Sequence, residues 1–401
     1  MSKLPNPSTT ICSRTKRLFD SSPEKITVLH LRDSPWLCGP GRTILESAVH
    51  IDPERFTYLI GAFCKFSEGS NEFIDAARGR NVNVFPIYED SPFDFNVISQ
   101  IMAIVKAHRV DFVHSHEFRS DIFAFLIHVL YGVPVLATSQ GWIQNDPKGR
   151  VMTWIDKLLL RFFNHVIVVS DKMRAELLRW GIREHRLSVI QNALVTSNFQ
   201  KDVDDRSFRT LHGIDDQTLL IAKIGRLSPE KRQIDVIAAA EAVVRSIPSV
   251  KFLIIGKGPD EDFLKREVHR RNLTPYFVFT GYIEDMHAVF NAIDLVVQTS
   301  TTEGMPNVIL EALAYEIPAI ATDVGGTGEI ITDGLSGILV PPKRPDLIAD
   351  HIVQFHRHPS PYRQMGATGR KRVTTAFGFD RRTDKLMDLY GTLSQRRRIR
   401  R

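Results

Sequence analysis

Short apolar runs alternate with longer stretches of helical period along most of the chain. After the polar residues 1–23, which are expected to form a mobile arm, seven β-branched runs recur, and helical stretches separate most of them. Strands that are apolar along their whole length and joined by helical crossovers are typical of a parallel sheet covered on both faces. The pattern therefore predicts a doubly wound α/β domain over residues 24–195. Its predicted strands are Ile26–Leu31, Phe56–Gly61, Val82–Pro86, Val110–His114, Val133–Thr138, Val166–Val169 and Leu187–Ile190.

A second series of the same kind begins after a polar, charge-dense stretch, residues 196–216, which we interpret as a linker. It predicts a second doubly wound domain over residues 217–376. Residues 377–395 carry apolar positions near helical period and are expected to form a terminal helix, with residues 396–401 as a basic tail. The predicted strands of the second domain are Leu219–Ile224, Val250–Ile255, Phe277–Thr280, Asp294–Gln298, Pro318–Thr322 and Gly337–Val340.

Length and composition agree with two buried cores. The chain has 401 residues, of which 43% are hydrophobic and 24% charged, and about 100 to 200 residues per domain is usual. The cysteines, Cys12, Cys38 and Cys64, are scattered without metal-ligand spacing, which favours a reducing compartment. The sequence has no apolar run of the roughly 18 residues that span a bilayer. It therefore predicts a cytoplasmic protein, with peripheral binding at the inner face of the cytoplasmic membrane left open.

Positive charge is concentrated at the C-terminal end. The formal net charge is +6, but five of the last six residues are arginine. No basic face with interleaved aromatic residues accompanies them, which argues against a nucleic-acid partner. We expect the run Arg396–Arg401 either to be a disordered, solubilising end or to bind an anionic membrane surface or a partner. A second membrane candidate, Trp154–Phe163, suits an interfacial helix as well as one packed between sheet and solvent.

Two glutamates flank a predicted helix start in the second domain. Glu303 follows a strand, and Glu311 lies inside a helix expected to open at Pro306, whose missing N–H costs nothing in the first turn. The free amides and the dipole at such a helix start favour an anion. A sugar nucleotide fits, because amides can hold its diphosphate while the carboxylates accept hydrogen bonds from hydroxyls on both sides. The donor contacts predicted here are Glu303, Gly304, Met305, Pro306, Asn307, Val308 and Glu311.

A turn after the first strand of the second domain carries two cations. Gly225 permits a tight turn, and Arg226 and Lys231 stand five positions apart across a proline-containing bend. We expect this bend to bring both cations to one point, without a neighbouring acidic cluster. Two cations can stabilise charge on a diphosphate leaving group, a role that a metal ion would otherwise take. The site is therefore predicted to contain neither a metal nor a cofactor.

Glycines and histidines end several other strands, at the edge where open parallel sheets bind ligands. In the first domain, Gly39 and Gly41 precede a helix predicted to begin at Thr43, and they would let the backbone approach a phosphate or sugar. His114 and His116 end another strand at the same edge. In the second domain, the candidates for contacts with a base and ribose are Gly256, Gly258, Gly281 and Tyr282.

Taken in order, these motifs resemble those of the retaining, GT-B fold glycosyltransferases of family 4. In the second domain the pattern comprises Gly225-Arg226 with Lys231, Gly256-x-Gly258-Pro259, Phe279-x-Gly281, Glu303-Gly with Glu311-Ala, and Thr322-Asp-Val-Gly-Gly with Glu329. Looser similarity extends through Asp111–His116, Val166–Ser170 and Leu187–Asn192. The resemblance covers about residues 25–395 and implies two Rossmann-like domains that face each other across a cleft.

The resemblance also implies roles for individual residues. Glu303 would contact the donor sugar, and Glu311 would bind the ribose. Arg226 and Lys231 would neutralise the diphosphate, and His116 would contact the sugar or help to place the acceptor. Transfer would retain the anomeric configuration without a bound metal ion, and the terminal helix would cross back to the first domain.

The chain departs from the family pattern at two places. It has Ser139-Gln140-Gly141 where a His-Gly or His-Asp pair is common. It also has Met305-Pro306 where Phe or a similar residue usually stands beside the glycine. We expect these changes to affect the identity of the donor more than the class of reaction.

Three functions remain open at this point. The first is transfer of a sugar from a nucleotide-diphosphate donor to a glycan, a lipid-linked glycan or a lipid. The second is epimerisation of a sugar nucleotide by an enzyme of the same fold, which would need no acceptor. The third is a catalytically silent protein that binds a sugar nucleotide or a membrane partner. We favour transfer, because the residues that the motifs require are all present: His116, Arg226, Lys231, Glu303 and Glu311.

Overall fold

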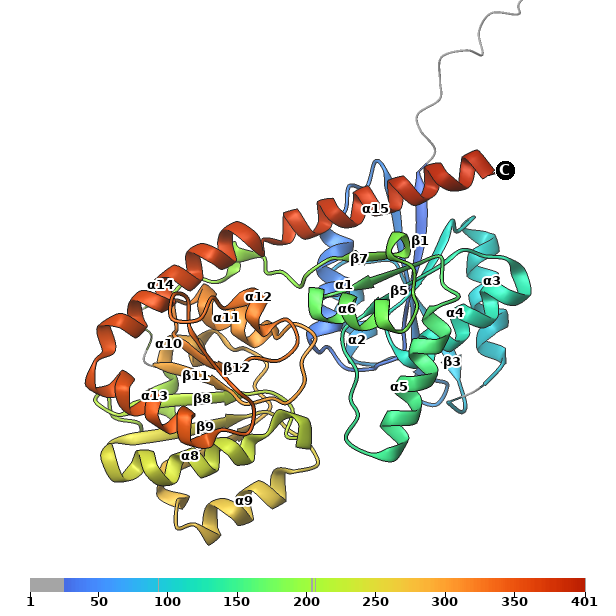
Figure 1. Ribbon diagram of the computed structural model, residues 1–401. Coiled ribbons are helices and arrows are strands. Elements are labelled where there is room, and N and C mark those ends of the chain that lie inside the picture. Colours follow the sequence, from blue (N-terminus) through green and yellow to red (C-terminus); the bar gives the residue numbers. More distant parts are fainter. Residues whose placement is uncertain (1–24, 93, 203–204, 206, 401) are drawn as a thin grey trace, which may run out of the picture.

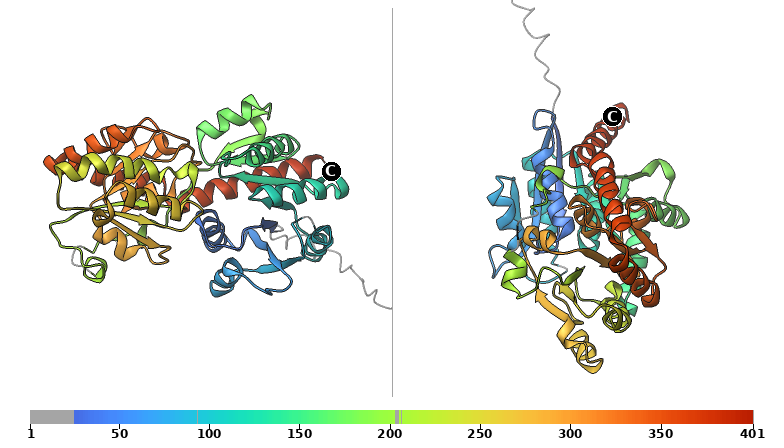
Figure 2. Two further views of the ribbon diagram at one scale, coloured as in Figure 1. Left: turned by 90° about the horizontal axis from the view of Figure 1, so that it is seen from below. Right: turned by 90° about the vertical axis from the view of Figure 1, so that its left-hand side faces the viewer.

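The computed structural model describes residues 25–92, 94–202, 205 and 207–400 and shows two α/β lobes side by side (Figures 1 and 2). The first lobe contains a seven-stranded sheet of order β3-β2-β1-β4-β5-β6-β7. The second contains a six-stranded sheet of order β10-β9-β8-β11-β12-β13. All neighbouring strands in both sheets are parallel. The predicted pair of doubly wound domains is therefore confirmed, whereas the proposed arm, residues 1–23, lies outside the described residues.

Local sequence signals explain where several helices of the first lobe begin. The side chain of Asn71 accepts a hydrogen bond from the amide of Ile74 at the start of α2, and Ser170 does the same for Met173 at the start of α6. The strands are β1 Ile26–Arg32, β2 Phe56–Lys65, β3 Val84–Glu89, β4 Phe112–Ser115, β5 Val135–Ser139, β6 His165–Val168 and β7 Leu187–Val189. The helices are α1 Gly39–His50, α2 Glu72–Gly79, α3 Asn96–Ala107, α4 Phe118–Tyr131, α5 Pro147–Leu160 and α6 Asp171–Arg179.

The second lobe follows the same alternation. Its strands are β8 Leu219–Ile224, β9 Val250–Ile255, β10 Phe277–Gly281, β11 Leu295–Gln298, β12 Ala319–Thr322 and β13 Ile338–Val340. Its helices are α7 Ser207–Leu211, α8 Gln233–Ser246, α9 Glu261–Arg270, α10 His287–Ala292, α11 Asn307–Ala314, α12 Thr327–Ile330, α13 Pro345–Arg357 and α14 Pro359–Ala376. Helix α7 lies within the predicted linker, and Arg209 fastens it to this lobe through the carbonyl of Ala292 and the carboxylate of Asp294.

Both sheets are buried on two faces, as continuous apolar strands require. In β8, Leu220 and Ala222 belong to one core, whereas Ile221 between them belongs to the core on the other face. The same alternation in β1 places Leu29 and Val28 in different cores. The side chains of the strands therefore fill the cores on the two faces of each sheet. We expect polar groups with chemical roles mainly in the loops at the carboxyl ends of the strands.

The terminal helix α15, Phe379–Arg400, leaves the second lobe and lies along the first (Figure 1). Leu386 and Tyr390 enter a core of the first lobe, and Arg382 donates a hydrogen bond to Ser47 of α1 over 2.8 Å. The helix does not end at residue 395 as predicted, because Arg396–Arg400 continue it. Arg397 donates to the carbonyl of Asp111 over 2.7 Å, so the expectation of a disordered end is wrong for the described part of the arginine run.

Candidate active site

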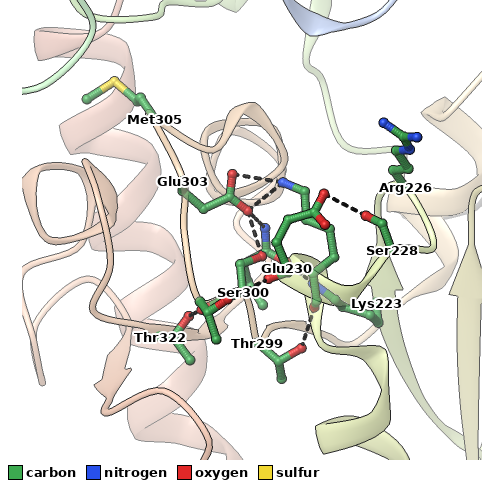
Figure 3. A network of polar contacts seen from close by, with 12 residues as sticks. Lys223, Arg226, Ser228, Glu230, Thr299, Ser300, Glu303, Met305 and Thr322 are labelled. Carbon is green, nitrogen blue, oxygen red and sulfur yellow. Dashed lines mark hydrogen bonds and ion pairs between the residues drawn. The ribbon is translucent and has the colours of Figure 1, made fainter. Parts of the chain in front are cut away.

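A cluster around Glu303 occupies the carboxyl edge of the second sheet (Figure 3). Lys231 contacts both carboxylate oxygens of Glu303, at 2.7 and 2.9 Å. Gln298 at the end of β11 and Ser300 in the following loop each donate to the same carboxylate over 2.7 Å. Four contacts from three residues fix the orientation of Glu303. A carboxylate held in this way is preorganised to act on a ligand without rearranging.

Lys223 of β8 lies beneath this cluster. Its amino group is fully buried and donates to the Gln298 side chain, which in turn donates to Glu303. Burial, and then the neighbouring Lys231, lower the pKa of Lys223 to about 7, whereas Glu303 opposes the shift. A negative ligand beside Lys231 and Glu303 would therefore favour the charged form of Lys223.

The structure does not bring the two predicted cations together. Lys231 is paired with Glu303, whereas Figure 3 shows Arg226 reaching away from the Glu303 carboxylate. Glu230 lies between them in sequence, and Ser228 donates to it over 2.6 Å. The prediction of two cations at one point without a neighbouring acid is therefore wrong. The reason is that the bend forms a short 3-10 helix, Pro229–Lys231, after which Arg232 adopts a left-handed conformation.

The glycine turns of the second lobe pack against one another. A Cβ on Gly258 would lie 2.2 Å from the carbonyl oxygen of Leu227, and a Cβ on Gly256 would lie 2.2 Å from that of Gly225. Gly256 also has a positive φ of 131°, which favours glycine. These glycines let the turn after β9 lie on the turn that carries Arg226. Gly281 is the last residue of β10, and the exposed Tyr282 follows it at the same edge.

The start of α11 is covered by the first lobe. The helix begins at Asn307, with Pro306 at its N-cap. The carbonyl of Met305 accepts a hydrogen bond from Asn192 over 3.0 Å, and a Cβ on Gly39 would lie 2.9 Å from the Asn307 side chain. The Oδ1 atom of Asn307 is buried and has no hydrogen-bond partner among the described residues. The segment Met305–Val308 therefore lies at the junction of the two lobes.

The structure changes the prediction for Gly41 and leaves that for Glu311 as it stands. Helix α1 begins at Gly39, before the predicted start at Thr43, so Gly41 lies inside its first turn, where a Cβ would lie 3.3 Å from Phe73. This glycine is a packing position of the first lobe. Glu311 lies within α11, and burial raises the pKa of its carboxyl while Arg42 of α1 lowers it. Its side chain therefore faces a cation of the opposite lobe.

A cavity of about 800 Å³ lies where the two lobes meet. Loop 139–146 and helices α4 and α5 supply most of its wall from the first lobe, and the turns at Arg226–Glu230 and Pro259–Asp260 supply the rest. Of the four predicted catalytic residues, His116 and Arg226 line it, whereas Lys231 and Glu303 do not. Six acids line it and were not predicted: Glu117, Asp121, Asp146, Asp156, Glu230 and Asp260.

Burial raises the pKa of several of these acids. Burial, and then Asp33, raise the pKa of Glu117 to about 8, against the opposing effect of its ion pair with Arg32. Burial also raises the pKa of Asp121, and the adjacent Asp156 raises it further. Asp156 accepts a hydrogen bond from the Trp142 indole over 2.7 Å. A protonated carboxyl group can both donate hydrogen bonds to hydroxyls and accept hydrogen bonds from them.

Three imidazoles gather beneath the cavity, and one of them was not predicted. His30 of β1, His114 of β4 and His116 offer ring nitrogens that lie within 4.8 Å of one another. Burial lowers the pKa of all three, to about 3 for His114. Among the described residues, these three histidines form a group whose ring nitrogens are close enough together to hold a metal ion. Hydrogen bonds occupy five of the six ring nitrogens, and the buried Arg382 lies close by, so a cation fits poorly here.

The sequence held partial signals for some of the missed residues. Glu117 follows His116 directly, and Asp121 lies four positions further on, which is one turn of the helix that begins there. His30 points inward from a strand whose apolar character concealed it. Tyr390 shares a hydrogen bond with His114. The two residues are 276 positions apart, so no local sequence pattern relates them.

The fold and the site together define a class of protein. Two Rossmann-like lobes with a carboxylate and lysine cluster at their junction are the architecture of GT-B glycosyltransferases. Residues 204–372 match the family model described as glycosyl transferases group 1, and residues 61–198 match the model of glycosyltransferase family 4. The chain therefore belongs to glycosyltransferase family 4 and is a glycosyltransferase.

Comparisons with individual proteins agree with this assignment. The chain is 23% identical over 388 residues to the Escherichia coli UDP-Gal:alpha-D-GlcNAc-diphosphoundecaprenol alpha-1,3-galactosyltransferase, covering 92% of this chain and 98% of the relative. It is 26% identical over 308 residues to the alpha-maltose-1-phosphate synthase of Mycolicibacterium smegmatis, covering 70% and 79%. The crystal structure of Anabaena HepE with UDP-glucose superposes with a TM-score of 0.81 at 18% identity, covering 92% and 100%. Within the described part of the chain, the helices are too short or too polar to cross a membrane.

Proposed function

We propose that the protein transfers a sugar from a nucleotide-diphosphate sugar to a glycan, with retention of anomeric configuration. The observation that carries the proposal is the Glu303 carboxylate, which Lys231, Gln298 and Ser300 orient at the junction of the lobes. Glu303 would accept hydrogen bonds from hydroxyls of the donor sugar. Lys231 would move from Glu303 towards the diphosphate as charge develops on the leaving group.

A sugar of uridine diphosphate as the donor is supported by similarity. HepE is described in complex with UDP and with UDP-glucose, and the E. coli relative is named for UDP-Gal. Arg226 on the cavity wall would bind the diphosphate from the opposite side to Lys231. Glu311 would bind the ribose at the start of α11. In this arrangement cations of the chain stabilise the leaving group, and we propose that no metal ion is required.

The lining of the cavity supports a neutral, hydroxyl-rich acceptor. Carboxyl groups outnumber cations in the wall, where Lys148 and Arg226 are the cations. The carboxyl groups of such a wall can hydrogen-bond sugar hydroxyls. Trp142 adds an aromatic surface on which a sugar ring can pack. A cavity for an acceptor distinguishes this proposal from an epimerase, which acts on the sugar nucleotide alone.

A thermal-shift panel tests the donor. Because a ligand that binds the native state stabilises it by mass action, UDP and UDP-sugars at a hundredfold excess over Kd should add about 2.7 kcal/mol. We expect UDP-glucose, UDP-galactose or UDP-N-acetylglucosamine to raise the melting temperature, with smaller shifts from GDP- and ADP-sugars. The absence of a shift with every nucleotide sugar in the panel would contradict the proposal. Conversion of the donor without any acceptor would favour the epimerase.

We also propose that the protein works in the cytoplasm, at the inner face of the membrane, through α5. One side of this helix lines the cavity through Met152, Thr153 and Asp156. Val151 and Trp154 are exposed on its other side, and Phe162 just beyond its end is exposed and packs on Phe125 of α4. The exposed cations nearby are Lys148, Arg150 and Arg161, while Lys157 and the single acid of residues 147–163, Asp156, are buried. This surface suits an anionic bilayer better than the arginine run, part of which packs on Asp111.

Vesicle sedimentation tests this surface. We expect the protein to bind vesicles that contain phosphatidylglycerol, and Trp154→Glu to reduce the bound fraction at least fivefold. Phe263→Glu is the matched control, because Phe263 is an exposed phenylalanine on α9 of the other lobe. Equal vesicle-bound fractions of the Trp154→Glu and Phe263→Glu variants would overturn the proposal that α5 binds the membrane. Loss of binding on deletion of residues 396–401 alone would favour the tail instead.

A further inference from the structure

The terminal helix makes a polar contact deep in the first lobe that packing alone does not require. Tyr390 of α15 is fully buried, and its hydroxyl lies 2.7 Å from Nδ1 of His114 and 3.3 Å from Nε2 of His30. Leu386 is the other buried residue of α15 in this core, and Met387, Leu389 and Leu393 pack against it. A residue from the far end of the chain therefore joins two histidines of adjacent strands, β1 and β4.

These contacts continue in both directions as a chain of hydrogen bonds. Beyond His114, Nε2 of its ring lies 2.8 Å from the hydroxyl of Thr138. Beyond His30, Nδ1 of its ring lies 2.9 Å from Nε2 of His116. The series of hydrogen bonds thus runs from Thr138 through His114, Tyr390 and His30 to His116, which lines the cavity. The last nitrogen, Nδ1 of His116, is buried and has no hydrogen-bond partner among the described residues.

Each link in this chain has one proton to give. Burial keeps the three imidazoles neutral, because it lowers their pKa values, and neighbouring charges lower them further. A neutral imidazole donates from one nitrogen and accepts at the other, and a tyrosine hydroxyl donates once while also accepting. All the hydrogen bonds must therefore point the same way along the chain. In one direction Nδ1 of His116 carries a lone pair, and in the other it carries a proton.

We propose that Tyr390 is a positioning residue for His116: its hydroxyl couples the His114 and His30 rings and so sets which nitrogen of His116 carries the proton. The inference rests on the proposed function, in which His116 faces the reacting sugars. A defined tautomer gives His116 one role towards a substrate hydroxyl, as acceptor or as donor. It also makes the site depend on the docking of α15.

Neighbouring groups do not supply the same coupling. Tyr58 lies 3.2 Å from Nδ1 of His30, but its hydroxyl donates to the carbonyl of Ile44 at the same distance and it does not reach His114. Arg382 donates to Ser47. Tyr390 is thus the group that links the two imidazoles, and replacing it by phenylalanine keeps the ring while it removes the link.

Nitrogen NMR of histidine-labelled protein, at neutral pH and without substrate, tests the proposal. In the parent protein, the ring nitrogens of His116 should show the chemical shifts of a single tautomer. In Tyr390→Phe they should move towards the average of the two tautomers. In the donor assay, kcat should fall about tenfold, the equivalent of one hydrogen bond, with the KM for the donor unchanged.

Tyr362→Phe is the matched control, because the Tyr362 hydroxyl also binds a histidine ring, that of His351 at 3.0 Å, but in the second lobe. It should leave the His116 shifts and kcat as they are. Identical His116 shifts in the parent and in Tyr390→Phe would overturn the proposal. The change in melting temperature on adding UDP is measured on the parent and on every variant. If the proposed function is wrong, the parent shows no such change. If only this inference is wrong, the parent still shows the change.

Discussion

Glu303→Gln is expected to reduce sugar transfer at least a hundredfold, which is the typical loss when one preorganised electrostatic contact is removed from an active site. Glutamine keeps the shape and an oxygen that can accept from Ser300, but it removes the charge that Lys231 contacts at 2.7 and 2.9 Å. Lys231→Ala should have a similar effect, because the diphosphate would lose its cation. Transfer is measured as kcat with the donor that the thermal-shift panel identifies.

A matched pair of variants on the same lobe controls for loss of charge. Glu261 and Lys265 of α9 also form an ion pair at 2.7 Å, but it is exposed on the helix surface, where such pairs contribute little to stability. Glu261→Gln and Lys265→Ala should leave both transfer and the melting temperature unchanged. The site variants should melt within a few degrees of the parent. Normal turnover in both of them would remove Glu303 and Lys231 from the mechanism.

The sequence predicted the architecture and one part of the site well, because both depend on local patterns. The apolar run Leu219–Ile224 coincides with β8. The strand before Glu303 ends at Gln298 both in the prediction and in the structure. Strand ends of a parallel sheet meet at one edge. This is why Lys231 and Glu303, 72 residues apart, could be expected near each other and are in contact.

The remainder of the site depends on contacts that a local pattern does not encode. The bend at Arg226 could not be oriented from its spacing, because the turn type decides where each cation points. Gly256 and Gly258 were interpreted as ligand contacts, but the carbonyls that they accommodate belong to another turn of the same lobe. The role of Tyr390 depends on how α15 docks on the first lobe, and the acids of the cavity are brought together by tertiary structure alone.

Close approach of the two lobes leads to the second large effect. Gly304 follows Glu303, and a Cβ on it would lie 2.0 Å from the carbonyl oxygen of Gln140 and 3.0 Å from Val169, both in the first lobe. Its φ does not lie in the left-handed region, so alanine suits the backbone itself. Gly304→Ala should therefore hold the lobes apart while each lobe folds normally. We expect transfer to fall at least tenfold, because closure completes the site and excludes water.

Gly258→Ala provides the contrast, because the clash it creates lies within one lobe. Its Cβ would lie 2.2 Å from the carbonyl oxygen of Leu227, a residue of the same lobe, so a movement of one lobe relative to the other does not relieve the clash. Overpacking of this kind costs about 1–3 kcal/mol, so this variant should melt several degrees lower than the parent. Gly304→Ala should instead keep the parental melting temperature and lose activity. If both variants lost stability equally, with activity in proportion to the folded fraction, Gly304 would be a packing position and not a point of closure.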